Sequence, residues 1–277
     1  MRHSEETITT DDGARIYRQQ WLPDGPAKAV VCVVHGLGEH SGRYGNVVTA
    51  LTDRGFAVFA LDLRGHGKSS GTRGDLRVDD AMRDIDQLLA DAQQQVPGVP
   101  VIIYGHSLGG LLTMTYVVRH RPQIAAHVST APALDTQLRD QKVKFTIANM
   151  LGGILPGVAI PTGGDSSTLS RDPDVVAAYD ADELVHDKGS FGLAKQSIEA
   201  MDALMDIEEY PVPLLLVHGT ADQWTIPAAS REFAGRVAGD VTLFEYEGLY
   251  HEPHHEPERE QVFADILEWL EIRVDLD

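Results

Sequence analysis

Residues 101–120 read VIIYGHSLGGLLTMTYVVRH, with a serine between two glycines where one apolar segment gives way to another. The apolar run Val101–Tyr104 predicts a buried strand, and Leu111–His120 predicts a helix. Between them, Gly105-His106-Ser107-Leu108-Gly109 has the form of the sharp turn that presents a nucleophilic serine above the end of a strand. The glycines are needed because side chains there would clash with closely packed backbone. A plain glycine-rich turn is the alternative, but the flanking strand and helix favour Ser107 as a nucleophile.

Short apolar runs alternate with helical patterns on both sides of this segment. Two N-terminal strands, joined by a turn at Asp12-Gly13, precede the alternating part. Near-continuous apolar strands separated by helices predict an α/β fold, with a mostly parallel central sheet and helices on both faces. Further strands are expected at Val30–Val34, Phe56–Leu61, Ile124–Thr130, Val212–Val217 and Val241–Tyr246, and further helices at Val47–Gly55, Val78–Val96, Ala228–Val237 and Glu256–Arg273.

A serine hydroxyl is unreactive until a base takes its proton, and a third group must orient that base. After this type of serine turn, the acid and the histidine follow in that order along the chain. Asp222 comes after the penultimate predicted strand, and His251 is the first histidine after the last one. Asp222 could instead be an ordinary turn residue, and His254 or His255 could be the base. We predict Ser107, Asp222 and His251 as the catalytic residues.

Two backbone N–H groups are needed to stabilise the oxyanion that forms on a carbonyl under attack. One is expected from Leu108, directly after the nucleophile. The other is expected from Leu37, in the loop His35-Gly36-Leu37-Gly38-Glu39-His40, where the two glycines allow a sharp turn. Such a loop could also hold phosphate, but no Gly-Lys-Ser/Thr sequence follows it.

The alternation breaks between residues 135 and 208. We therefore expect a core in two parts, 1–134 and 209–277, with an inserted cap at 135–208. Helical patterns cover Asp172–Tyr179 and Phe191–Met205 within it. The uncharged run Phe145–Gly164 contains glycine and proline, which exclude a single helix along its length. It is either a buried, irregular part of the cap or a mobile apolar lid that meets lipid, and a role in binding an acyl chain is the preferred interpretation.

Composition limits the remaining function classes. The net charge of -19 argues against nucleic acid and anionic membrane surfaces as partners. The polar first residues do not resemble a secretory signal, and no stretch is long and apolar enough to span a membrane. The single cysteine, Cys32, cannot form an intramolecular disulfide, which fits a cytoplasmic location.

Histidine is abundant, but its spacing does not indicate a metal. No set of His, Cys, Asp and Glu has the spacing of metal ligands on a helix, so we expect neither a catalytic metal nor a cofactor. His66, His106 and His218 lie beside sharp turns and are expected to brace them rather than to act in catalysis.

Three segments together resemble a known family: His35–Tyr44 (HGLGEHSGRY), Asp62–Ser69 (DLRGHGKS) and Gly105–Gly110 (GHSLGG). They are similar to those of the monoacylglycerol lipases, in the lysophospholipase-like branch of the α/β-hydrolase superfamily. The resemblance covers nearly the whole chain. It implies the α/β-hydrolase fold and a serine hydrolase that cleaves monoacylglycerols through an acyl-enzyme, releasing glycerol and a free fatty acid. It also implies a lipid ester as the small-molecule partner and an apolar cap over the acyl chain. The uncharged run Phe145–Gly164 could form an exposed patch for transient, peripheral contact with micelles or a membrane surface, or for dimerisation.

In that family a Glu, an Arg and a His form a polar network near the glycerol group, and the matching positions here are Glu39, Arg43 and His254. The alternative is that Glu39 and Arg43 form only a structural ion pair that braces the oxyanion loop. His255 replaces the Asn that related bacterial sequences tend to have, which puts head-group selectivity in doubt. A carboxylesterase or lysophospholipase with the same triad is the nearest alternative function, and a non-catalytic binding protein of this fold is a more distant one.

Overall fold

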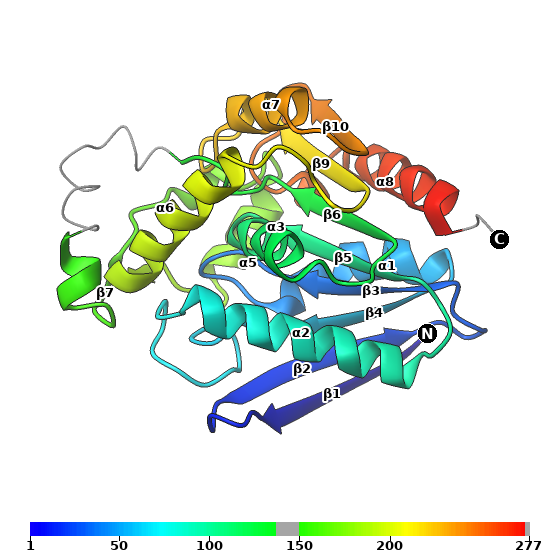
Figure 1. The fold of residues 1–277 in the computed structure, drawn as a ribbon, viewed down its shortest axis with the longest axis horizontal. Helices are drawn as coiled ribbons and strands as arrows, with labels where there is room; N and C mark the ends of the chain where they lie inside the picture. Colours follow the sequence, from blue (N-terminus) through cyan, green and yellow to red (C-terminus); the bar gives the residue numbers. More distant parts are fainter. Residues whose placement is uncertain (137–149, 275–277) are drawn as a thin grey trace.

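A computed structural model describes residues 1–136 and 150–274, and its centre is an eight-stranded sheet (Figure 1). In sheet order the strands are β1 (Arg2–Thr9), β2 (Arg15–Leu22), β4 (Phe56–Leu61), β3 (Ala29–Val34), β5 (Val101–His106), β6 (Ala126–Thr130), β9 (Leu214–Gly219) and β10 (Val241–Tyr246). β1 and β2 form an antiparallel hairpin, and β2 pairs antiparallel with β4. All other neighbours in this sheet are parallel, which confirms the predicted α/β class.

Helices cover both faces of the sheet (Figure 1). One face packs against α1 (Gly45–Asp53) and α8 (Arg259–Val274), and the other against α2 (Val78–Gln95), α3 (Leu108–His120) and α7 (Pro227–Arg236). β3 explains why both layers are needed, since all six of its residues, AVVCVV, are buried. Alternate side chains of this strand contribute to the two opposite cores. A continuous apolar run is what a strand covered on both faces requires.

The chain between β6 and β9 forms an additional group of elements, on the left in Figure 1. It contains the antiparallel pair β7 (Ala159–Pro161) and β8 (Lys188–Ser190), the short 3₁₀ helix η2 (Ser166–Thr168), α5 (Pro173–Asp180) and α6 (Phe191–Met205). α5 and α6 correspond to the two helices predicted within the cap. α6 packs against α3, so this segment is anchored on the helix that follows Ser107.

Part of the uncharged run predicted in the cap, residues 145–149, lies outside the described residues. The remainder exposes five large apolar side chains, with exposed fractions of 43% to 70%: Met150, Ile154, Leu155, Val158 and Ile160. This part is therefore not the buried segment that one of the two interpretations expects. Among the residues that the structure describes, no helix is long and apolar enough to cross a bilayer.

α3 begins at Leu108, directly after the serine, and not at Leu111 as the sequence pattern suggests. The pattern is misleading because Gly109 and Gly110 are poor helix formers. They are required by packing rather than by helix propensity. A Cβ on Gly109 would lie 2.2 Å from the carbonyl oxygen of Val34, so only glycine lets α3 approach β3 this closely.

Candidate active site

Ser107 occupies the turn between β5 and α3, with φ of 54° and ψ of −116°. A residue other than glycine rarely adopts positive φ, and strain of about 1–3 kcal/mol of this kind gathers at functional sites. Gly105 makes the turn possible, because a Cβ there would lie 2.3 Å from Thr113 Oγ1 and 2.6 Å from the Gly109 carbonyl oxygen. The turn places the Ser107 hydroxyl at the N-terminus of α3.

Asp222 and His251 reach Ser107 from the loops that follow β9 and β10. His251 Nε2 is 2.9 Å from Ser107 Oγ, and His251 Nδ1 is 2.8 Å from Asp222 Oδ2. The structure thus brings all three predicted residues together, in the order that proton transfer from a serine requires. His251, rather than His254 or His255, is the histidine hydrogen-bonded to the serine.

The surroundings of His251 favour its protonated form. Burial alone would lower the pKa of His251, but the charge of Asp222 and the hydrogen bond between them raise it above its ordinary value of 6.5. Burial opposes ionisation of Asp222 as well, yet His251 and His218 hold the pKa of that carboxyl far below its usual range. The Thr225 hydroxyl and the Trp224 backbone N–H also donate to this carboxylate, each at 2.7 Å. Asp222 is therefore held as an anion that can orient His251 and stabilise its charge.

The loop after β3 lies against the nucleophile. A Cβ on Gly36 would come within 3.1 Å of the serine Cβ. Glu39 holds the loop in shape, since its Oε1 accepts hydrogen bonds from the Gly36 N–H at 2.6 Å and the Tyr44 hydroxyl at 2.7 Å. Leu37 lies in this loop, and Leu108 is the first residue of α3, where backbone N–H groups have no partner within the helix. Both residues predicted as oxyanion donors thus belong to segments that adjoin the serine.

The segment between β6 and β9, here called the cap segment, also contacts this loop. The Gly38 carbonyl oxygen accepts a hydrogen bond of 2.8 Å from the His186 N–H. A Cβ on Gly38 would lie 2.2 Å from the His186 carbonyl oxygen, and φ at Gly38 is 80°, so space and conformation both require glycine. His40 Nε2 is 2.8 Å from Asp182 Oδ2. The position of the loop therefore depends on contacts with residues 182–186.

Arg43 joins two buried glutamates behind this loop. Its guanidinium binds both carboxylate oxygens of Glu252, at 2.6 and 2.7 Å, and Glu39 Oε2 at 2.8 Å. Burial would raise the pKa of both carboxyls, but the positive charge of Arg43 outweighs it and holds both below their usual range. His255 completes the network, with Nδ1 2.8 Å from Glu252 and Nε2 2.9 Å from the Arg43 carbonyl oxygen. The network links the loop after β3 to the residue next to His251.

His254 lies beside this network without a hydrogen bond to it. Its ring is fully buried and stacks on Tyr44, with ring centres 5.2 Å apart, and neither nitrogen has a hydrogen-bond partner among the described residues. Burial holds the pKa of His254 well below its ordinary value, so the ring is neutral. Of the three residues that the resemblance places in one polar network, Glu39 and Arg43 form an ion pair, whereas His254 has no hydrogen bond to either. Arg43 binds Glu252 instead. Sequence reasoning did not identify Glu252.

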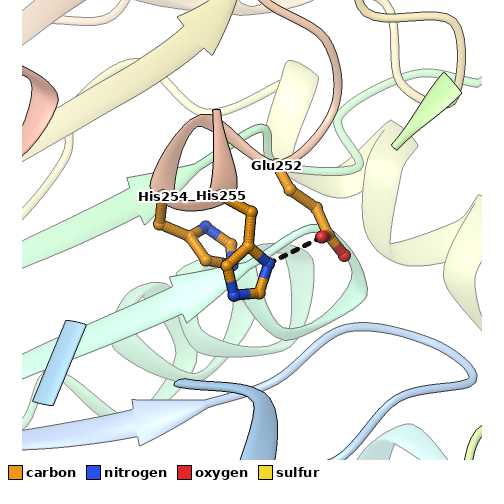
Figure 2. A group of neighbouring side chains, drawn as sticks. All are labelled: Glu252, His254 and His255. Carbon is orange, nitrogen blue, oxygen red and sulfur yellow. Dashed lines mark hydrogen bonds and ion pairs between the residues drawn. The ribbon is translucent and has the colours of Figure 1, made fainter. Parts of the chain in front are cut away.

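Glu252, His254 and His255 carry donor atoms within 4.8 Å of one another, close enough for a shared metal ion, in the part of the chain that the structure describes (Figure 2). Figure 2 shows the His255 ring directed at the Glu252 carboxylate, with the His254 ring next to it. Both oxygens of Glu252 bind Arg43, and both nitrogens of His255 have protein partners. A divalent cation would have to displace a guanidinium from a buried carboxylate, which is strongly unfavourable. We therefore assign Glu252 and His255 to the ion-pair network, with the neutral His254 ring packed beside it.

The three histidines expected to brace turns behave differently. His66 Nδ1 is 2.9 Å from the Arg64 carbonyl oxygen, and His106 Nδ1 is 3.1 Å from that of Thr130. His218 contacts the catalytic acid directly, with Nε2 3.1 Å from Asp222 Oδ2. It therefore belongs to the surroundings of the triad rather than to a turn alone.

A cavity of about 340 Å³ is lined mainly by the cap segment. Leu37 and Trp224 form part of its wall, and Trp224 stacks on His251. The cap segment contributes three acidic residues to the lining: Asp180, Asp182 and Asp187. Sequence reasoning did not identify Trp224, for which the only signal is its position two residues after Asp222.

Comparisons with known proteins agree with this geometry. The family model Hydrolase_4, described as serine aminopeptidase, S33, matches residues 25–258. A monoacylglycerol lipase of Mycolicibacterium smegmatis is 37% identical over 96% of this chain and 96% of its own length. An abhydrolase domain-containing protein of Dictyostelium discoideum is 37% identical over 99% of this chain, which spans 30% of that longer protein. The crystal structure of a Paleococcus ferrophilus monoacylglycerol lipase is 38% identical with a TM-score of 0.85, over 92% of this chain and 98% of that one.

The family model covers β3 to β10, the segment between β6 and β9 and the loops that carry Ser107, Asp222 and His251. The matches agree with the mostly parallel sheet. The chain therefore belongs to the Hydrolase_4 (serine aminopeptidase, S33) family of α/β-hydrolases, in the group that includes the monoacylglycerol lipases.

Proposed function

We propose that the protein is a serine hydrolase that cleaves the ester bond of monoacylglycerols. The observation that carries this proposal is the chain of contacts from Asp222 through His251 to Ser107, at 2.8 and 2.9 Å, beside a cavity bordered by the cap segment. The relatives named monoacylglycerol lipase support the substrate class.

The reaction proceeds by two acyl transfers. His251, oriented by Asp222, takes the proton of Ser107 as its Oγ attacks the ester carbonyl, and the N–H groups of Leu37 and Leu108 receive the oxyanion. Protonated His251 gives its proton to the glycerol oxygen as the C–O bond breaks, which leaves the acyl group on the serine. A water molecule that loses a proton to the same histidine then hydrolyses the acyl-enzyme and releases the fatty acid.

The leaving group is proposed to be uncharged. Asp180, Asp182 and Asp187 border the cavity, so they would repel a head group that carries a net negative charge. Glu39 and Arg43 do not line this cavity, and their side chains are only 4% and 8% exposed. We therefore favour the role of a structural ion pair for them over direct binding of glycerol.

The cap at residues 135–208 is proposed to cover the acyl chain, between the core parts 1–134 and 209–277. Its exposed apolar side chains between Met150 and Ile160 are proposed to make transient contact with micelles or a membrane surface. Large apolar side chains that gather on one surface commonly mark such a contact or a ligand groove.

A substrate panel tests the reaction and the leaving group together. It comprises monoacylglycerols of several chain lengths, a diacylglycerol, p-nitrophenyl esters, lysophosphatidylcholine and an anionic lysophospholipid, with Ser107→Ala as the inactive control. The highest kcat/KM is expected on monoacylglycerols. A preference for the lysophospholipids would instead assign a lysophospholipase, and turnover retained by Ser107→Ala would refute the triad.

A further inference from the structure

We propose that Trp224 is a positioning residue for the catalytic histidine. Trp224 connects the cap segment to the proton-transfer step and stabilises the charged form of the His251 imidazole. This inference rests on the proposed role of His251 as the base. It concerns a wall of the cavity that stacks on the catalytic histidine and hydrogen-bonds to the cap segment.

The Trp224 indole is held on three sides. Its face lies nearly parallel to the His251 imidazole, with 15° between the ring planes and 5.6 Å between the ring centres. Its Nε1 donates a hydrogen bond of 2.8 Å to Thr168 Oγ1, in η2. Its six-membered ring lies against Gly164, where a Cβ would come within 2.2 Å of Cη2. One face of the indole therefore contacts the base, and two of its edges contact the cap segment.

The backbone of Trp224 contacts Asp222, the residue that orients His251. Its N–H donates a hydrogen bond of 2.7 Å to Asp222 Oδ1, the oxygen that does not bind His251. A displacement of residues 164–168 would thus be transmitted through the indole to the imidazole. This arrangement gives the cap segment a direct influence on the alignment of His251.

The indole also favours the charge that His251 acquires during each acyl transfer. An aromatic face attracts a cation within about 6 Å of its centre, and tryptophan does so best. Among the other groups near the imidazole, the carboxylates of Asp222, Glu252 and Glu39 attract the charge. His106 lies 4.9 Å away between ring centres and is neutral, because burial lowers its pKa to about 4. The indole adds an attraction that needs no ionised group and covers one face of the imidazole.

Two replacements at this position separate charge stabilisation from packing. Trp224→Phe keeps a smaller aromatic face, and Trp224→Leu keeps none. With a short, soluble p-nitrophenyl ester we expect kcat to fall about 3-fold for Phe and about 10-fold for Leu, while KM changes by less than about 2-fold. The apparent pKa of the acid limb of kcat/KM should decrease from wild type to Trp224→Phe to Trp224→Leu. Trp269→Phe, which removes a buried indole from α8, is the matched control and should change neither value.

Fluorescence gives a second measurement, since a protonated imidazole quenches an indole stacked on it. The difference in emission between wild type and Trp224→Phe should titrate with the kinetic pKa, and His251→Asn should abolish that titration. Trp21 also stacks on a histidine, His3, with ring centres 4.8 Å apart. That contribution is common to both proteins, so it cancels in the difference.

The connection to the cap segment is tested at Thr168. Thr168→Val removes the acceptor of the indole N–H and should lower kcat about 2-fold to 3-fold, whereas Thr168→Ser retains a hydroxyl and should restore it. The inference is overturned if the apparent pKa of the acid limb of kcat/KM is the same in Trp224→Leu as in the wild type, whatever the kcat or melting temperature of the variant. It is equally overturned if the apparent pKa of the acid limb is higher for Trp224→Leu than for Trp224→Phe, which is the result expected if water entered beside the imidazole. Fluorophosphonate labelling of Ser107→Ala would instead refute the proposed triad, which keeps the two failures distinguishable.

Discussion

Replacing Arg43 by methionine would leave two buried carboxylates without their cation. Arg43 binds Glu252 through two nitrogens and Glu39 through one, and the three side chains are only 2% to 8% exposed. Methionine fills much of the same space, so the loss is mainly electrostatic. Removing one partner of a buried ion pair costs about 3–5 kcal/mol. With about 2 °C per kcal/mol for a chain of this size, we expect the melting temperature at neutral pH to fall by about 6–10 °C.

The size of this loss should depend on pH. In the wild type, Arg43 holds the pKa of Glu39 and Glu252 below the ordinary value of 4.5, so their contribution to stability is present above that value and is lost as the pH falls through the folded-state pKa. In Arg43→Met, burial dominates and raises the pKa of both carboxyls above 4.5. The loss of stability in Arg43→Met is therefore greatest at neutral pH and becomes smaller as the glutamates take up protons. The deficit in melting temperature should shrink between about pH 7 and about pH 5.

Calorimetric melts of wild type and variant across this pH range measure both effects. Arg43→Met combined with Glu252→Gln removes one of the two unpaired charges and should recover part of the lost stability. Arg43→Lys supplies a point charge that cannot bind both oxygens of Glu252, so its melting temperature should be intermediate. The reasoning is refuted if Arg43→Met melts within about 2 °C of wild type at neutral pH, or if its deficit does not change with pH.

Three further predictions concern catalysis. Ser107→Ala should lower kcat on the order of 10⁴-fold or more and abolish fluorophosphonate labelling, with a melting temperature close to wild type; near-normal turnover would contradict the nucleophile. The value of kcat/KM should fall as the pH drops through the pKa of His251, which Asp222 raises above 6.5, and a profile flat between about pH 5 and about pH 9 would argue against a histidine base. Ile154→Glu, in the exposed apolar part of the cap, should lower several-fold the ratio of turnover on micellar monoacylglycerol to turnover on a soluble ester, and an unchanged ratio would count against surface contact.

The loops that carry Ser107 and Asp222 could be predicted because each follows a strand with a continuous apolar run, and the loop of His251 because it follows the last strand pattern in the chain. Ser107 stands between glycines that only a tight turn requires, and Asp222 and His251 are the first suitable residues after the last two strands. The fold class follows from the same runs, since strands without polar alternation need cover on both faces. These inferences use information that lies within a few residues along the chain.

The ion-pair network could not be predicted in this way. Arg43 and Glu252 are 209 positions apart, and no local pattern indicates which arginine will meet which glutamate. The family resemblance pointed to His254, but the short helix η3 (Pro253–His255) directs that ring against Tyr44. The same turn explains why α8 begins at Arg259 rather than at residue 256 as predicted.

The contact between Gly38 and His186 has a consequence for how such enzymes can diversify. The His186 carbonyl group fills the space that any side chain at position 38 would need, and its N–H fixes the loop that carries Leu37. A foreign cap grafted between β6 and β9 would bring its own backbone path and would remove this support, however well it accommodated a new acyl chain. We therefore expect that exchange of the cap alone would disturb the loop that carries Leu37, and that residues 35–44 would have to be exchanged along with the cap.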